Sequence, residues 1–228
     1  MTFIRKRLFE TQPELTLKGS IVNVAVDITS YEGDKTTAEL RITPRLNPEG
    51  EDIYLDEAID NCYKLDYDSE NNLLEIDLDL DDILEHLEET TDLKKSRRIK
   101  EALLLLTVPH KCSIELDNEN SSIKVSDLIG NHIIGTDNGR IEVNRNQGKL
   151  DLDSENGRII VKSQEGNLTA KTENGRIEIS EVSGKEIELI TENGSIQSRS
   201  ADYSNGTITT ENGAIYYEFL NNQRCGIE

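Results

Sequence analysis

The chain has 228 residues and a formal net charge of −20, with 45 Asp and Glu against 25 Lys and Arg. Nucleic acid and anionic membrane surfaces are therefore excluded as broad partners, although a local basic patch is compatible with this charge. Aromatic residues make up only 4% and Trp is absent, which favours a narrow core of stacked Leu and β-branched side chains over a globular sandwich built on large rings.

The first residues, 1 to 9, contain Arg5, Lys6 and Arg7 but no apolar run as long as that of a secretory signal. No segment of the chain is apolar for long enough to span a bilayer. The sequence therefore predicts a protein without a direct membrane span. It is cytoplasmic by the absence of a signal peptide, or associated with the cell envelope if a signal was removed.

Residues 1–80 show several runs in which apolar residues alternate with polar ones, as in Val22, Val24, Val26 and Ile28. Alternation with period two is typical of half-buried strands. We interpret residues 1–110 as irregular N-terminal β coils and a cap, because the open end of a stacked structure has to be covered.

The pattern breaks at residues 81–100, where an acidic stretch is followed by a basic one. Ile83, Leu84 and Leu87 follow Asp81 with spacings that suit a short helix capped by that aspartate. A charged insertion is expected here, either helical or a solvated loop, and we place Ile83 outside the core.

Cysteine and histidine give no sign of a metal site or of a disulfide framework. Cys62, Cys112 and Cys225 are odd in number and widely spaced, and the three histidines are scattered without a metal-binding spacing. Cys112 shares a strand face with Ile114, so it is expected to be a small buried side chain. No cofactor is predicted.

From residue 129 onward a short Asn-Gly phrase recurs, and its glycines are 18, 18, 19 and 19 residues apart. A second, weaker glycine series lies midway between them. Because Gly and Asn tolerate positive φ, the phrase predicts tight structural turns. The turn residues are Asn138, Gly139, Asn156, Gly157, Asn174, Gly175, Asn193, Gly194, Asn212 and Gly213.

Asn-Gly between alternating apolar residues also suits an antiparallel meander of hairpins. A meander has no reason to keep an acid before each Asn and an arginine after several of the glycines at the same 18-residue spacing. Stacked coils of two strands do have a reason to keep this spacing, because equivalent positions then lie roughly 4.8 Å apart. We therefore expect an all-β fold, a parallel β-solenoid of about 18-residue coils over residues 111–228, continuous with residues 1–110 in one structural domain.

Arg140, Arg158 and Arg176 follow three of the turn glycines and are expected to stack in a row. The turn acids Asp137, Glu155 and Glu173 and the strand acids Glu142 and Glu178 could neutralise this row in a salt-bridge ladder. The row could instead bind an anionic polymer through guanidinium forks. Both readings stay open on the sequence alone.

The segment LLLLTVPHKCSIELDNENSSIKVSDLIGNHIIGTDNGRIEV, followed by DSENGRIIV, KTENGRIEI and ITENGSIQS, resembles the bacterial putative-adhesin domain family of unknown function. The resemblance covers nearly the whole chain and is strongest from about residue 103. It implies a β-helical fold, no established catalytic residues and an adhesin label that rests on analogy. Some relatives accompany envelope-stress systems of Gram-positive bacteria.

The function expected from these features is that of a non-catalytic interaction module, adhesin-like or envelope-associated. Its partner is unknown, and a protein or an anionic cell-envelope polymer would fit. The alternative is a polysaccharide-active lyase or glycosidase that uses outward carboxylates such as Asp151, Asp153, Glu142 and Glu178. Calcium binding of the β-roll type is disfavoured, because arginine stands where a ligand is needed.

Overall fold

The computed structural model describes residues 2–44, 52–90, 99–219 and 224–227, which form 18 strands and two helices. The strands of the N-terminal part are β1 (Phe3–Glu10), β2 (Leu15–Val22), β3 (Ala25–Tyr31), β4 (Lys35–Pro44), β5 (Tyr63–Asp68), β6 (Leu73–Asp79) and β7 (Ile99–Pro109). The later strands are β8 (Cys112–Asn118), β9 (Ile123–Ser126), β10 (His132–Thr136), β11 (Ile141–Gln147), β12 (Leu150–Ser154), β13 (Ile159–Glu165), β14 (Leu168–Thr172), β15 (Ile177–Thr191), β16 (Ile196–Thr210), β17 (Ile215–Phe219) and β18 (Arg224–Ile227). Helix α1 is Asp52–Cys62 and helix α2 is Leu80–Thr90.

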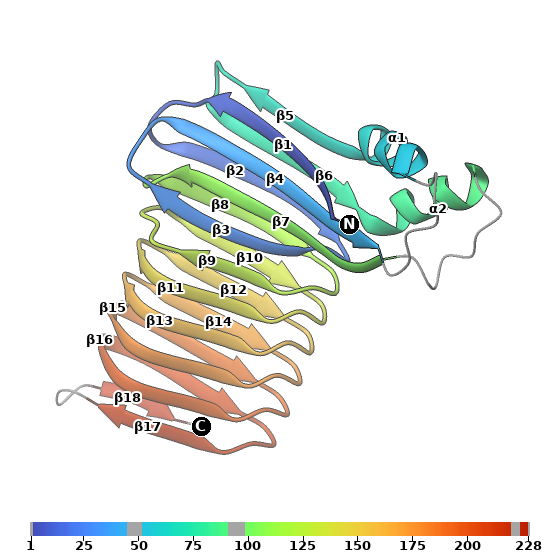
Figure 1. Ribbon diagram of the computed structural model, residues 1–228. Coiled ribbons are helices and arrows are strands. Elements are labelled where there is room, and N and C mark those ends of the chain that lie inside the picture. The colour runs from blue at the N-terminus through green and yellow to red at the C-terminus, as the bar shows by residue number, and fades with distance from the viewer. Residues whose placement is uncertain (1, 45–51, 91–98, 220–223, 228) are drawn as a thin grey trace.

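From β8 onward, strands separated by one turn of the chain pair in parallel. On one side β8, β10, β12 and β14 lie next to one another, and on the other side β9, β11, β13 and the first half of β15 do so. Ile141 pairs with Ile159 and Ile159 with Ile177, so residues 18 positions apart share one column. The long strands β15 and β16 pair along almost their whole length and belong to both sides (Figure 1).

The predicted fold class, a parallel β-solenoid, is wrong. The 18 strands form one sheet of mixed parallel and antiparallel order, which curls back on itself around the core. Antiparallel ladders join β1 to β4, β4 to β7 and β5 to β6. The register argument rested on a phrase that first occurs at residue 137, and it carried no information about how the strands before that phrase pair.

The two helices lie together beside β5 and β6 at the N-terminal end (Figure 1). Helix α1 was not expected from the sequence, although Leu55, Ala58 and Ile59 are buried with helical spacing. Helix α2 occupies the acidic half of the predicted insertion, and the basic half lies largely within residues 91–98, outside the described residues. Among the described residues, no helix is long and apolar enough to cross a membrane.

The core is one continuous cluster of inward-facing aliphatic side chains. Ile141, Ile159, Ile177 and Ile196 are each 0% exposed and stack in a single column. Ile83 of α2 is also 0% exposed and belongs to this cluster, so its expected place outside the core is wrong. The buried face of α2 extends the core over the N-terminal end of the sheet.

The Asn-Gly turns pack closely against one another, and their glycines do not have a left-handed backbone conformation. Among the described glycines, positive φ occurs only at Gly148 and Gly166, which belong to the second glycine series. A Cβ on Gly175 would lie 1.8 Å from the carbonyl oxygen of Gly157, directly along the stack. The expectation of positive φ at the Asn-Gly glycines is therefore wrong, and the requirement for glycine there comes from close approach of two backbones.

Each turn is fixed by two kinds of side-chain hydrogen bond. Thr172 Oγ1 accepts a bond from the Gly175 amide at 3.0 Å, and the same atom donates toward the Gly157 carbonyl at 3.3 Å. Outside, the asparagine amides form a ladder in which Asn174 Nδ2 donates to Asn156 Oδ1 at 2.8 Å. The ladder runs from Asn212 through Asn193, Asn174, Asn156, Asn138, Asn120 and Asn23 to the carboxylate of Asp81 on α2.

Candidate functional site

The outward side chains of β9, β11, β13 and the first halves of β15 and β16 form a surface that we call the basic face. Alternation along each strand turns these side chains away from the core, and the parallel register places them in rows. Before the bend in these strands, the cations of the basic face are Lys124, Arg140, Arg158, Lys162, Arg176 and Arg199, and its strand carboxylates are Glu142 and Glu178. At the bend lie Asp127, Arg145 and Glu181, and beyond it β13 adds Glu165. Positive charge is therefore in excess on this face of a protein whose net charge is −20.

The opposite side of the sheet, formed by β8, β10, β12, β14 and the second half of β15, is the acidic face. Its carboxylates are Glu115, Asp117, Asp151, Asp153, Glu186 and Glu188, and its cations are Lys149, Lys171 and Lys185. Partial burial, followed by the nearby charge of Asp151, raises the pKa of Asp153. The two sides of the molecule thus carry opposite charge.

The arginine row predicted from the sequence is present as a column. The amides of Ile123, Ile141 and Ile159 donate to the carbonyls of Arg140, Arg158 and Arg176 at 2.8, 3.0 and 3.0 Å. All three side chains are exposed. The structure therefore brings the three predicted residues together.

The acids that neutralise this row come from the strands. Arg140 Nη2 lies 3.4 Å from Glu142 Oε2, and Arg176 Nη1 lies 3.3 Å from Glu178 Oε1. Arg158 reaches across to the same Glu178 oxygen. The turn acids Asp137, Glu155 and Glu173 are exposed and form no ion pair with another described residue, so they border the row without neutralising it by contact.

Glu178 is the residue on which two of the arginines converge. Partial burial acts to raise the pKa of its carboxyl, but hydrogen bonds from Arg158 and Arg176 outweigh burial and hold that pKa below its ordinary value. The Glu178 side chain is 24% exposed, against 42% for Arg158 and 54% for Arg176. The carboxylate therefore lies beneath two guanidinium groups that face solvent.

Lys124, Lys162 and Arg199 were not singled out from the sequence. Lys162 lies on β13, four residues after Arg158, which directly precedes that strand, and shares its outward direction. Strand alternation combined with the 18-residue register could therefore have found it. Lys124 and Lys162 form no ion pair within the described part of the chain. Arg199 forms no ion pair with a described residue either, so these three cations of the face are not neutralised by a contacting carboxylate.

The carboxylates considered for glycoside chemistry do not gather at one place. Glu142 and Glu178 lie on the basic face in ion pairs, whereas Asp151 and Asp153 lie on the acidic face. An open groove of about 440 Å³ crosses β2, β6 and β8, and it is lined by other carboxylates, including Glu75 and Asp77. Within that groove Glu115 is paired with Lys18 at 2.6 Å, and Asp77 with Lys64 at 2.9 Å.

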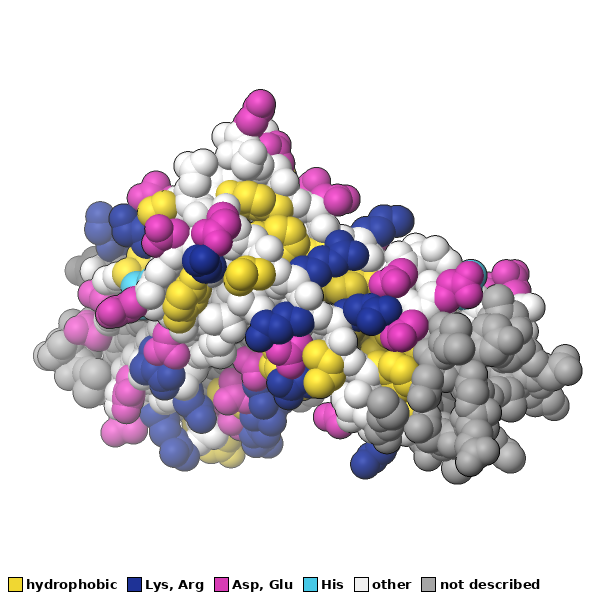
Figure 2. Space-filling view, turned by 45° about the horizontal axis from the view of Figure 1, so that its top comes forward, with side chains coloured by type: hydrophobic (Ala, Val, Ile, Leu, Met, Phe, Trp, Pro, Cys, Tyr) yellow, Lys and Arg dark blue, Asp and Glu magenta, His cyan; other side chains and the backbone are white. Residues whose placement is uncertain are grey.

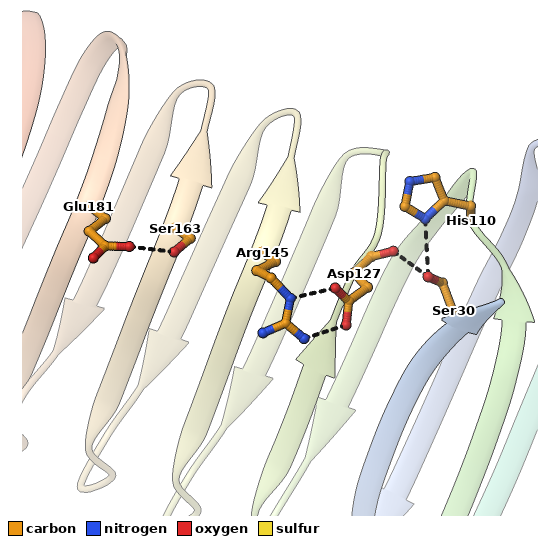
Figure 3. Close-up of polar contacts among 6 residues, drawn as sticks. All are labelled: Ser30, His110, Asp127, Arg145, Ser163 and Glu181. Atoms are coloured by element: carbon orange, nitrogen blue, oxygen red, sulfur yellow. Dashed lines mark hydrogen bonds and ion pairs between the residues drawn. The ribbon is translucent and has the colours of Figure 1, made fainter.

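Ser30 and His110 lie together at a corner of the sheet, in the line of polar side chains shown in Figure 3. Ser30 Oγ donates its single proton to the backbone oxygen of Asp127, so it accepts from His110 Nδ1 at 3.1 Å. The Asp127 carboxylate is bound by Arg145 at 2.6 and 2.7 Å rather than by the histidine. This arrangement does not activate the serine as a nucleophile.

The same corner recurs along the sheet as a column of left-handed residues. Asp127, Arg145, Ser163, Glu181 and Ser200 have φ values of 62°, 49°, 53°, 56° and 55°. Their side chains pair along the column, and Ser163 Oγ donates to Glu181 Oε2 at 2.9 Å (Figure 3). These contacts fix the bend between the two faces and so set the direction of each outward row.

The N-terminal cap adds apolar side chains beside basic ones. Ile4 and Leu8 of β1 are 55% and 58% exposed, and Lys6 lies between them. In the view that brings this end forward, yellow apolar side chains lie among dark blue basic ones (Figure 2). Glu39 of β4 pairs with both Lys6 and Arg41, so one carboxylate here is shared by two cations.

Comparisons with known proteins assign no family. No protein-family profile matches the chain, and a search of curated protein sequences finds no match.

Within the described residues, no group of three His, Cys, Asp or Glu side chains is placed to hold a metal ion.

Several solved structures are similar at low scores. A putative cell adhesion protein from Clostridium sporogenes has 9% identity and a TM-score of 0.37, covering 95% of this chain and 100% of its own. A putative adhesin from Parabacteroides merdae has 14% identity and a TM-score of 0.33, covering 99% and 96%. A putative lipid binding protein from Parabacteroides distasonis has 9% identity and a TM-score of 0.31, also covering 99% and 96%. The resemblance to the adhesin domain family stays a prediction.

Proposed function

We propose that this protein is a non-catalytic interaction module and that its basic face binds an anionic polymer, such as a phosphate- or carboxylate-bearing polymer of the cell envelope. The observation that carries the proposal is the separation of charge between the two faces of one sheet. An acidic protein gains solubility from carboxylates anywhere on its surface, and solubility gives no reason to gather cations on one side.

The geometry of the arginine row suits a repeating ligand. Guanidinium groups present several N–H donors in a planar fork that matches carboxylate and phosphate oxygens. Parallel pairing spaces the three arginines by roughly 4.8 Å per strand, so an extended polymer crossing the strands would meet one fork after another. The turn acids border the row on one side, so the polymer would lie toward Lys162 and Arg199.

The test is calorimetric titration of the protein with polyphosphate and with polygalacturonate, using neutral dextran as the uncharged polymer. We expect binding to one or both polyanions, weakening steeply between low and physiological salt because exposed charges are screened. The triple variant Arg140→Gln, Arg158→Gln, Arg176→Gln should lose this binding.

The matched control is Lys18→Gln, Lys149→Gln, Lys171→Gln, which removes the same charge from the acidic face and its groove. It should bind as the wild type does. Absence of any polyanion binding by the wild-type protein, or equal loss in both triple variants, would contradict the proposal. Polysaccharide cleavage stays an untested alternative, and product analysis in the same titrations would detect it.

A further inference from the structure

We propose that Glu178 competes with anionic ligands for the basic face. Its carboxylate binds the guanidinium groups of Arg158 and Arg176 until a ligand displaces it. The inference rests on the proposed function and names the contact that regulates that site. Its origin is a difference among the three strands that follow an arginine: β11 and β15 carry a glutamate at one register position, and β13 carries an isoleucine. Glu142, Ile160 and Glu178 occupy the same register position on β11, β13 and β15.

Ile160 breaks the pairing of each arginine with an acid on its own strand. Arg140 directly precedes β11 and pairs with Glu142 on that strand, and Arg176 directly precedes β15 and pairs with Glu178. Arg158 has Ile160 at the corresponding position, so its nearest strand acid is Glu178 on the neighbouring strand. Ile160 faces outward by alternation yet is only 4% exposed, so a buried apolar side chain lies between Glu142 and Glu178 in this row.

Both guanidinium groups bind the same carboxylate oxygen, Oε1 of Glu178. One negative charge therefore restrains two positive ones, which leaves this pair of arginines with an excess charge of one. Each guanidinium has five N–H donors, more than this single contact uses. A phosphate or carboxylate arriving from solvent can engage the free donors first and then compete for those held by Glu178.

The experiment compares Glu178→Gln with two variants that add the same unit of positive charge. Glu142→Gln releases only Arg140, and Glu188→Gln on the acidic face releases no arginine. The probes are polyphosphate and polygalacturonate at low salt. Because exposed ion pairs are individually weak, release of two pairs should raise affinity roughly three- to tenfold, and release of one pair should raise it less.

Affinity in the order Glu178→Gln, then Glu142→Gln, then Glu188→Gln supports the inference. Equal gains for Glu178→Gln and Glu142→Gln, or no gain for either, would overturn it while leaving polymer binding by the wild type intact. If neither the wild type nor Glu178→Gln binds, the proposed function fails along with it. Binding by Glu178→Gln without binding by the wild type would also overturn the inference, because the ligand would then not displace Glu178.

Thermal melts and circular dichroism of each variant check that the fold is retained. A second measurement on the wild-type protein does not depend on substitution. In NMR spectra, the guanidinium Nη–H signals of Arg158 and Arg176 should shift together on addition of polyphosphate, because Nη2 of Arg158 and Nη1 of Arg176 lose the same acceptor, Glu178 Oε1. Shifts confined to Arg140 would contradict the inference.

Discussion

At the scale of single residues, Gly175 shows how closely the turns approach one another. Changing it to Ala places a Cβ 1.8 Å from the Gly157 oxygen and 2.6 Å from Thr172 Oγ1. We expect Gly175→Ala to lower the free energy of unfolding by about 1 to 3 kcal/mol or more, as for overpacked positions, in urea denaturation.

Two further variants test whether close approach of the backbones causes the loss of stability in Gly175→Ala. Gly175→Asn should be at least as damaging, although Asn tolerates left-handed backbone, since the obstacle is a carbonyl oxygen and not a φ angle. Gly33→Ala should cost much less, because the atoms in its way belong to the outer edge of the Tyr31 ring. Wild-type stability for Gly175→Ala would show that neighbouring turns are farther apart than the structure places them.

His132 is an ionisable residue inside the apolar stack. It pairs in register with Ile114 and Leu150 and is 1% exposed. Neither ring nitrogen forms a hydrogen bond of normal geometry, although the nearby Asn146 side chain opposes part of the effect of burial on the pKa of His132. Burial lowers its pKa to about 4. The unfolded chain, with an ordinary histidine pKa near 6.5, therefore binds a proton over a pH range in which the folded protein does not.

Stability should consequently fall as the pH drops from about 6.5 toward 4, and this contribution is fully present only above that range. Between pH 7 and pH 4.5 the loss from His132 amounts to roughly 2 kcal/mol. Other groups also titrate here, so the measurement is the difference between wild type and His132→Leu in urea denaturation at both pH values. Parallel pH profiles for the two proteins would contradict the assignment.

At the scale of elements, α2 is part of the core and does not lie outside it. Ile83 on α2 and Ile177 on β15 are both 0% exposed, so each change to Ala should cost about 2 to 5 kcal/mol. The matched control is Ile133→Ala, since Ile133 is 55% exposed on the acidic face and should lose less than about 0.5 kcal/mol. Chemical denaturation of the three variants measures the free energy of unfolding. A loss for Ile83→Ala as small as that for Ile133→Ala would place α2 outside the core.

At the scale of the whole molecule, the two ends of the sheet differ in which elements cover them. The N-terminal end carries both helices, and Arg5 of β1 pairs with Asp56 and Asp60 of α1 at 3.2 and 3.1 Å. At the other end, β17 pairs with β16 alone among the described strands. Strands β11 and β13 each have a parallel partner on both sides.

We therefore expect amide hydrogen exchange to be slowest in β11 and β13 and fastest in β17, because opening an end strand breaks one ladder and opening a central strand breaks two. Mass-spectrometric exchange on the intact protein followed by peptide digestion measures this. Equal protection of β17 and β13 would mean that the end of the sheet is covered in solution.

The sequence by itself determined the all-β class, the two strands per 18 residues, the inward aliphatic columns and the arginine row. These features depend on alternation and on a fixed register, which local residue order records. The same register also indicates that Lys162 faces outward, although the sequence alone did not single it out.

Only the tertiary structure decided what depends on partners distant in the chain. The antiparallel pairing of β1, β4 and β5 has no repeated phrase to reveal it, and helix α1 shows only a short apolar pattern. Gly175 is required by the carbonyl of the turn beside it, and Glu178 receives Arg158 because Ile160 offers that arginine no acceptor. These outcomes depend on distances between backbones and side chains, and residue order does not contain those distances.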